Sequence, residues 1–300
     1  MPMEQDEGLL AERFQAHHPR LRAVAYQMLG SLSEADDAVQ EAWLRVSRAG
    51  TGGVDNLGGW LTTVVARVCL DMLRSRAARR EEPLGVHLPD PVISQPDVLD
   101  PEQEALLAEG VGLALLVVLD TLAPAERLAL VLHDTFAVPF EEIAAILGRS
   151  PAATRQLASR ARRRVRAAPA RPDADLAGQQ RAVDAFLAAA RNGDLEALVA
   201  ILDPDVVARA DWGKAPTRVP TVLRGARAVA EQALAFAQRA PYGRPALVNG
   251  AAGVVVAAGT RLIAVMGFTV RGDKITEIDI LADPERLRHL DLTALGNRPG

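Results

Sequence analysis

The feature that most constrains this chain is a run of five prolines between residues 83 and 101. Proline lacks a backbone N–H and fixes φ, so no continuous helix crosses such a run and an extended backbone is favoured. Fully extended, these residues would reach about 60 Å, the length of about 18 base pairs of duplex. A second break, APARPDAD, occupies residues 168–175. The two breaks predict three blocks in this chain of 300 residues.

The first block reads as helices. Apolar residues at 21, 24, 25 and 28 recur at helical spacing, after His17, His18 and a helix start expected at Pro19. A second helix follows, with Ser33 and Asp36 in a capping-box arrangement. A glycine-rich loop, AGTGGVDNLGG, leads to a third helix from Trp60. From composition alone, one hypothesis is that this loop accommodates an unstacked base. Aromatic residues make up 4% of the chain, so aliphatic side chains must build the cores.

The second block has the form of a helix-turn-helix. Gly148 is placed to end one helix, Ser150 to cap the next, and Pro151 to occupy its first turn. The inward stripe of the second helix is Thr154, Leu157, Ala158, Ala161 and Val165, and its outward side carries Arg155, Gln156, Ser159, Arg162, Arg163 and Arg166. Arg155 and Gln156 suit base edges in the major groove, and the later arginines suit phosphates. A net charge of −4 does not oppose this, because DNA binding needs only a local basic surface.

The third block changes from helices to strands. Helices are predicted around 183–190, 195–202 and 226–237, and strands over 246–259, 261–270 and 274–283, with a hairpin turn at residues 271–273. Helices followed by an antiparallel sheet indicate an α+β domain.

Other chemistry is weakly represented in the sequence. Cys69 is the single cysteine and reads as a buried hydrophobe, and the histidines are too scattered for a metal site. Asp211 could act as a general base in the mouth of the last domain, but a loop ion pair or interdomain contact is favoured. No secretory signal or membrane span is expected, so the expected compartment is the cytoplasm. We expect no catalytic residue, metal or cofactor.

Four segments carry a resemblance to a known family. They are EADDAVQEAWLRV (34–46), GGWLTTVVARVCLDMLRSR (58–76), LAPAERLALVLHDTF (122–136) and FEEIAAILGRSPAATRQLASRARRRV (140–165). In this order they resemble regions 2 and 4 of extracytoplasmic-function sigma factors, specifically those with a SnoaL-like C-terminal extension. The resemblance covers nearly the whole chain.

The resemblance implies partners for particular residues. Core RNA polymerase, through its β′ and β subunits, would be bound by Asp37, Gln40, Glu41, Leu44 and Arg45. The −10 promoter element would be bound by Trp60, Arg67, Arg74 and Arg76. The −35 element would be bound by Arg155, Gln156, Ser159, Arg160 and Arg163. The proline-rich linker would bridge the two promoter elements.

Three further motifs resemble those of the SnoaL-extended group, in which the extension regulates the sigma core. The linker motif is HLPDP, with Leu88, Pro89, Asp90 and Pro91. The C-terminal motifs are DWGK, with Asp211 and Lys214, and DPERL, with Asp283, Pro284, Glu285 and Arg286. DWGK is one residue shorter than the pattern of the group, and HLPDP has histidine in place of tryptophan.

The expected architecture is therefore multidomain, with two all-α sigma modules followed by an α+β SnoaL-like cone related to nuclear transport factor 2. The expected boundaries are 1–81 for region 2, 82–108 for the linker, 109–168 for region 4 and 175–295 for the SnoaL-like domain. The alternative is a catalytic or small-molecule-binding SnoaL-like protein with an accessory helix-turn-helix. A small ligand in the cone stays open under both readings.

Overall fold

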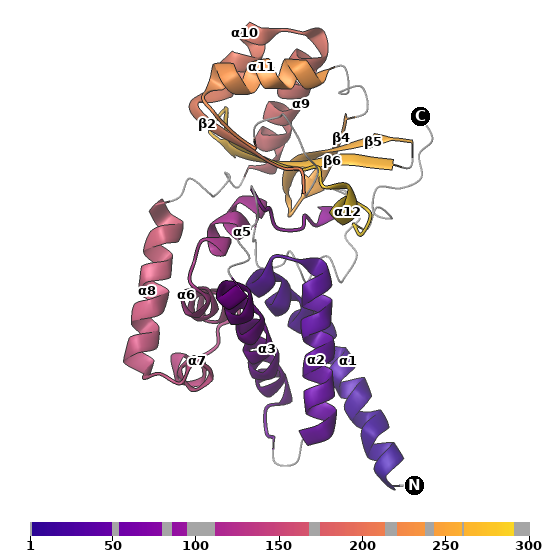
Figure 1. Cartoon of the computed structure of the whole chain (residues 1–300), viewed down its shortest axis with the longest axis vertical. Helices are drawn as coiled ribbons and strands as arrows, with labels where there is room; N and C mark the ends of the chain where they lie inside the picture. The colour runs from indigo at the N-terminus through magenta and orange to yellow at the C-terminus, as the bar shows by residue number, and fades with distance from the viewer. Residues whose placement is uncertain are drawn as a thin grey trace. The chain divides into compact units, whose positions relative to one another are not determined.

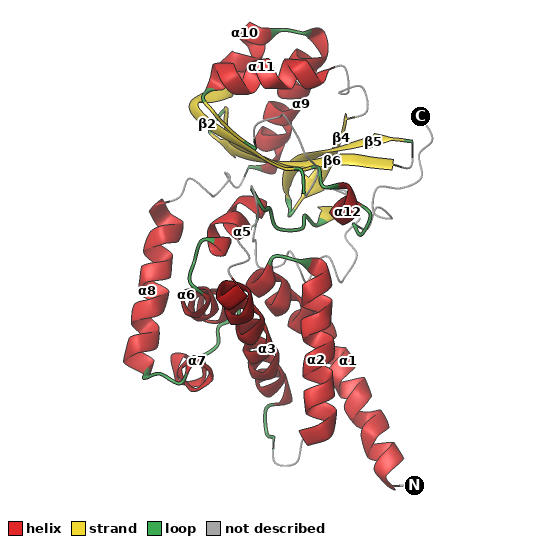
Figure 2. Cartoon of the chain, in the orientation of Figure 1, coloured by secondary structure: helices red, strands yellow, loops and turns green. Residues whose placement is uncertain are grey.

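The computed structural model describes residues 2–49, 54–79, 86–94, 112–167, 175–213, 221–237, 243–259 and 261–290. These residues form two compact units, which are shown in Figures 1 and 2. The helical unit holds the described residues of 1–82 and 118–168, and the mixed unit holds those of 83–103, 110–117 and 169–300. No helix within the described ranges has the length and apolar character that a membrane span requires.

The helical unit begins with three helices that pack together, α1 (Pro2–Leu29), α2 (Leu32–Ala49) and α3 (Leu57–Arg79). Their fully buried side chains include Leu21, Val24, Tyr26, Met28, Val39, Val46, Leu61 and Val65. On α2 the buried positions recur every three or four residues, so one stripe faces the core and the remaining positions face outward.

Two expected features of these helices are wrong. Pro19 lies inside α1 and does not start it, because α2 and α3 bury the following turns and hold the helix together across the missing N–H. The cap of α2 is Ser31, whose Oγ accepts the Glu34 N–H at 3.5 Å, and Ser33 lies within the first turn. Ala35 is fully buried, so the helix must begin early enough to include it.

The second part of the helical unit contains the helix-turn-helix. It comprises α6 (Pro124–Leu130), a π-helical turn (Val131–Thr135), α7 (Phe140–Leu147) and α8 (Pro151–Ala167), with α5 (Leu113–Asp120) preceding them in the chain. Gly148 ends α7 with φ of 63°, a backbone conformation that glycine adopts without steric strain. Ser150 Oγ then accepts the Ala153 N–H at 3.2 Å and caps α8, where the sequence placed the cap.

The two helical blocks pack against each other within this unit, although the sequence suggested separated modules. The Arg127 side chain is buried and donates from Nε and Nη2 to the Gln27 carbonyl, both at 3.1 Å. Arg127 also pairs with Asp120, and Arg20 donates to the Phe136 carbonyl at 3.2 Å. A buried guanidinium with these acceptors fixes the second block on the first.

The mixed unit is built on a seven-stranded sheet of order β1-β4-β5-β6-β7-β2-β3. The strands are β1 (Ile93–Ser94), β2 (Leu202–Asp211), β3 (Val222–Arg224), β4 (Gly243–Val248), β5 (Ala251–Ala258), β6 (Arg261–Arg271) and β7 (Lys274–Leu281). The helices are α9 (Leu176–Asn192), α10 (Leu195–Ile201), α11 (Ala226–Ala237) and α12 (Pro284–Leu287). Residues of α9, α10 and α11 form the core with one face of the sheet, as Figure 1 shows.

Two features of this sheet differ from the antiparallel sheet expected from the sequence. β2 and β7 pair in parallel, because the meander from β4 to β7 ends beside β2 and runs in its direction. The linker also contributes β1, which pairs with β4 through Ile93 opposite Val248. Periodicity reveals that a segment is a strand but not which distant strand becomes its neighbour.

Candidate functional site

The outward side of α8 displays the residues expected to read DNA. Arg155, Gln156 and Arg163 are exposed and Ser159 is half-buried, while Thr154, Leu157, Ala158 and Ala161 on the opposite side are buried. This arrangement presents a guanidinium and an amide side by side near the helix N-terminus, as direct readout of base edges requires.

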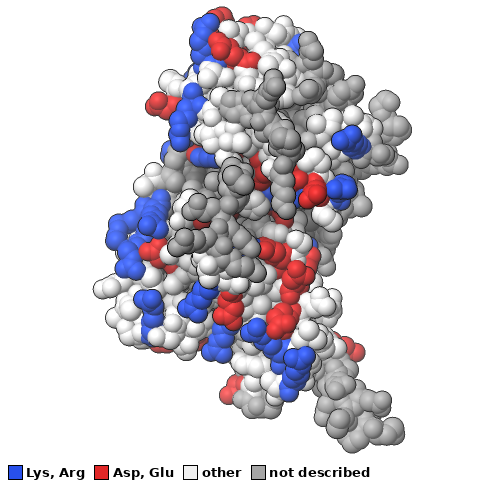
Figure 3. Space-filling model, in the orientation of Figure 1, with Lys and Arg blue, Asp and Glu red and all other residues white. Residues whose placement is uncertain are grey.

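Ion pairs within the unit engage several arginines of α8. Arg155 donates to Glu141 at 2.8 Å, and its guanidinium lies 5.5 Å from the centre of the Phe140 ring. Arg160, an expected DNA contact, instead donates at 3.0 Å to Glu126, a buried carboxylate that Arg164 also contacts. Arg162 forms a further ion pair with Asp134. The basic side chains over α8 are visible in Figure 3. Because pairs to exposed carboxylates are weak, they orient Arg155 without removing it from reach of DNA.

A second candidate surface, the α2 surface, consists of Asp37, Gln40, Glu41, Leu44 and Arg45, all of which are exposed. Leu44 is one of two large hydrophobic side chains among the described residues that stand out as exposed, at 40%. Arg45 donates to Glu41 at 2.9 Å and lies 3.8 Å from Asp71. A single exposed leucine is ordinary on a protein surface, so the resemblance, and not this exposure by itself, makes the α2 surface a candidate for protein binding.

A third candidate surface lies beside it on α3. Arg67 and Arg74 are exposed and Trp60 is half-buried, whereas Arg76 pairs with Glu34 and donates to the Leu29 carbonyl at 3.4 Å. Trp60 and Arg67 line a depression of about 200 Å³ together with Arg45, Val46, Ala49 and Val64. The structure therefore brings Trp60 and Arg67 together and assigns Arg76 to an ion pair between helices. Residues 50–53 of the glycine-rich loop lie outside the described part of the chain.

The linker motif and the two C-terminal motifs meet in the mixed unit. Arg286 donates to Asp211 at 2.7 Å, to Asp90 at 2.8 Å and to the Leu88 carbonyl at 2.6 Å. Asp211 Oδ2 also accepts the Leu88 N–H at 3.0 Å, and His87 Nδ1 lies 3.6 Å from the same oxygen. Asp90 and Asp211 are both buried. We call Asp90, Asp211, Arg286 and the Leu88 backbone the linker clasp.

Residues around the linker clasp hold the rest of the segment in place. Pro89 and Pro91 are buried with Leu88, and Asn249 exchanges hydrogen bonds with the Val92 backbone at 2.8 and 3.1 Å. Residues 86–94 are therefore fixed on the mixed unit in this structure. The extended span expected from the prolines would require this segment to leave the unit.

The other residues of the C-terminal motifs have separate places. Asp283 caps α12 by accepting the Glu285 N–H at 2.8 Å, Pro284 begins that helix, and Glu285 is exposed. The Asp283 carboxylate packs so closely on Gly213 that it leaves no space for a side chain there, and the φ of 65° at Gly213 also favours glycine. Lys214 lies outside the described residues.

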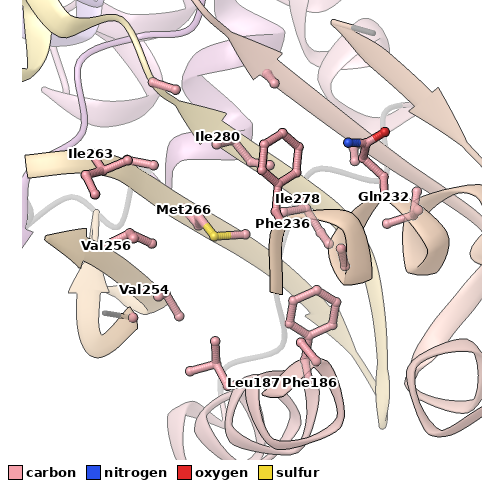
Figure 4. A pocket seen from close by; sticks show the side chains of 18 of the residues that line it. Phe186, Leu187, Gln232, Phe236, Val254, Val256, Ile263, Met266, Ile278 and Ile280 are labelled. Carbon is pink, nitrogen blue, oxygen red and sulfur yellow. The ribbon is translucent and has the colours of Figure 1, made fainter. Parts of the chain in front are cut away.

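A cavity of about 180 Å³ lies between the sheet and helices α9 and α11, and Figure 4 shows it at close range. Ala208, Ala210, Ile278 and Ile280 line it, so alternate residues of β2 and β7 point into the cavity. Asp211 follows Ala210 and faces the linker instead, so it is not a general base in this cavity. Among the described residues, no titratable side chain lines it.

Sequence reasoning missed two groups of residues in the mixed unit. The sequence placed Asn249 inside a predicted strand over 246–259 and assigned it no role, because its role depends on a linker residue that lies far away in the chain. The second group is Arg209, which donates to Asp279 at 3.0 Å and to Glu277 at 3.1 Å. Glu277 and Asp279 lie at alternate positions of the predicted strand 274–283, but no strand was predicted around Arg209, so the sequence contained no signal for this pairing.

Comparisons with known proteins agree on a family. The family model Sigma-70 region 2 matches residues 13–79, and Sigma-70, region 4 matches residues 112–165. The chain is 43% identical over 288 residues to ECF RNA polymerase sigma factor SigJ of Mycobacterium tuberculosis, covering 91% of each. It is 34% identical over 283 residues to probable ECF RNA polymerase sigma factor SigI of the same species, covering 91% of this chain and 93% of the relative.

A solved structure extends this similarity to the fold. The crystal structure of Mycobacterium tuberculosis SigJ superposes with a TM-score of 0.77 at 36% identity, covering 94% of this chain and 99% of that chain. Both the helical modules and the C-terminal mixed domain are included in that coverage. The chain belongs to the extracytoplasmic-function sigma factors, the RNA polymerase subunits that direct transcription to promoters, and it carries a SnoaL-like C-terminal domain.

Proposed function

We propose that this sigma factor reads the −35 element with α8, contacts the −10 element with α3 and binds core RNA polymerase with the α2 surface. The outward display of Arg155 and Gln156 on a capped helix carries the proposal for α8. Arg155 and Gln156 would contact base edges, Ser159 and Arg163 would contact phosphates, and Arg160 would contribute only after leaving Glu126.

The other two surfaces differ in their chemistry, so we assign the α2 surface to the polymerase and the surface on α3 to DNA. The α2 surface offers an apolar side chain, Leu44, within a ring of charges, which suits the β′ subunit of core polymerase as the resemblance implies. The depression containing Trp60 and Arg67 suits a base stacked on an aromatic ring beside a cation. Arg74 is exposed and free to reach phosphate, while Arg76 supports α3 through Glu34.

We further propose that the SnoaL-like domain restrains the sigma core in cis through the linker clasp. Residues 88–94 are buried on that domain and cannot at the same time bridge two promoter elements. The clasp therefore stabilises a state that does not initiate transcription, and its release shifts the population toward one that does. No separate anti-sigma protein is needed for this restraint.

The catalytic alternative is less well supported. It requires a general acid or base within the cavity, and the described lining residues supply none. We propose that the chain has no catalysis of its own and acts where RNA polymerase acts, in the cytoplasm.

The assignment of α8 is tested by DNA binding of the holoenzyme to the −35 sequence that it enriches from a random library. Arg155→Ala and Gln156→Ala should each reduce discrimination against a wrong −35 base by about 10- to 100-fold. Arg163→Ala should weaken binding to all sequences alike and lower the salt slope by about 1. Fluorescence anisotropy at several salt concentrations measures both quantities.

Arg227→Ala is the matched control, because Arg227 is an exposed arginine that pairs with Glu231 in the mixed unit, as Arg155 pairs with Glu141. It should change neither quantity. If Arg155→Ala and Gln156→Ala both leave −35 discrimination intact, α8 does not read bases.

A further inference from the structure

We propose that the cavity of the SnoaL-like domain binds a small, uncharged and largely apolar molecule that carries one hydrogen-bond acceptor. The proposal goes beyond promoter recognition and does not depend on it. Three observations on the cavity carry it: its walls, its size and one unsatisfied donor.

The walls are apolar except for the amide of Gln232 and the indole N–H of Trp212, among the residues that the structure describes. Figure 4 shows Phe186 from α9, Phe236 from α11 and Met266 from β6 extending toward a common space. Among the described lining residues, Gln232 carries the one side-chain amide, and no side chain is charged. Such walls favour an apolar ligand by removing its surface from water, and they oppose a charged one, whose desolvation nothing repays.

The volume selects ligands of about one or two rings. A cavity of about 180 Å³ is slightly larger than an engineered apolar cavity of about 150 Å³ that stays dry and binds benzene. The space exists because small residues from the strands and both helices line it: Ala190, Ala208, Ala210, Ala233, Ala264 and Ala282. Protein cores are close-packed, so a wall with so many alanines leaves room that a larger aliphatic side chain would fill.

One polar atom of a residue that lines the cavity has no hydrogen-bond partner among the described residues. Trp212 lines the cavity, and its indole Nε1 is buried without a hydrogen-bond acceptor among the described residues. The indole stacks on Phe236, with ring centres 5.9 Å apart and planes inclined by 28°. A buried donor without an acceptor is unfavourable, so an ether, carbonyl or hydroxyl oxygen on the ligand would be stabilised there.

Three probes of similar size test this chemistry on the full-length protein, without polymerase or DNA. Anisole is uncharged and has one acceptor oxygen, ethylbenzene is uncharged and has none, and benzoate is charged. Calorimetric titration should show saturable binding of anisole, about two- to tenfold weaker binding of ethylbenzene, and none of benzoate. Anisole should also raise the Tm in a concentration-dependent way.

Substitutions locate the binding and assign the donor. Ala233→Leu on α11 and Ala264→Leu on β6 fill the cavity from different elements, and each should abolish binding. Ala235→Leu is the matched control, since Ala235 is exposed on the same helix as Ala233, and it should bind as the parent does. Trp212→Phe should equalise anisole and ethylbenzene while keeping both. Circular dichroism and the Tm of each variant identify any variant that fails to fold. If one of the two cavity-filling variants does not fold, the other alone tests whether the ligand binds in the cavity.

Several results would overturn the proposal. One is the absence of saturable binding of anisole and ethylbenzene up to their solubility limits. Another is binding of benzoate as tight as that of anisole, and a third is full binding by a folded filling variant. Loss of anisole preference in Ala235→Leu but not in Trp212→Phe would overturn the assignment of the donor. None of these results depends on whether α8 reads a promoter.

Discussion

Among single residues, Asp279 has the most unusual electrostatic position. Its carboxylate is 2% exposed on the sheet face opposite the cavity, and Arg209 contacts it at 3.0 Å. Arg209 also contacts Glu277, so two buried carboxylates share one guanidinium. Burial is the dominant influence and raises the pKa of Asp279 to about 6, although Arg209 opposes the increase.

This position makes stability depend on pH in a defined direction. The unfolded chain releases the proton of Asp279 near pH 3.8 and the folded chain near pH 6, so the folded state binds the proton more tightly. The free energy of unfolding should therefore fall, by on the order of 1–3 kcal/mol, as the pH rises from about 4 to about 6. Asp279→Asn should flatten this part of the profile in urea denaturation. Asp184→Asn, at an exposed carboxylate on α9, should leave it unchanged.

Among the elements, the linker is the one whose place depends most on distant partners. Residues 86–94 lie on the SnoaL-like domain through the linker clasp, Asn249 and the pairing of β1 with β4. Removing one member of a buried ion pair leaves the other charge uncompensated and commonly destabilises by about 3–5 kcal/mol. In a variant that lacks Arg286, residues 86–94 should therefore detach from the SnoaL-like domain under conditions in which the rest of the domain stays folded.

Arg286→Ala tests this at the linker itself. The amides of Leu88 and Val92 should exchange with deuterium faster, because their acceptors or the surrounding segment lose their anchor. Run-off transcription with core polymerase should increase, because the linker is released. Arg288→Ala is the control, since Arg288 is exposed two positions further on and its Nε donates to the Pro284 carbonyl at 3.1 Å, within its own helix end. Unchanged exchange in Arg286→Ala would show that the clasp does not hold the linker.

The sequence predicts those elements whose ends are set by nearby residues, and it fails for those that depend on distant contacts. Gly148, Ser150 and the helix Ala226–Ala237 were placed correctly because caps and periodicity act within a few residues. The passage of α1 through Pro19 and the strand at Ile93 were not, since each depends on packing from elsewhere in the chain. For the candidate site, sequence reasoning found both ends of the linker clasp through motifs, but geometry alone showed that Arg286 joins them.

For the whole molecule, two C-terminal truncations separate restraint from polymerase binding. A chain ending at Leu287 keeps Arg286 and should retain the slow exchange of residues 86–94. A chain ending at Asp283 lacks it and should show faster exchange and higher run-off transcription. Both should bind core polymerase as the full chain does, because the α2 surface lies in the other unit. Loss of polymerase binding in either would contradict a purely regulatory role for the last domain.

The order of the elements along the chain limits what release of the linker achieves. The helix that ends at Ala167 is followed by α9 after only a few residues, with its cap at Asp175. Eight steps of extended backbone span at most about 28 Å. The start of α9 therefore stays within that reach of the end of α8, whether or not the linker clasp is released. If α8 binds the −35 element as proposed, this short connection would keep the SnoaL-like domain tethered near promoter DNA even after the linker is released.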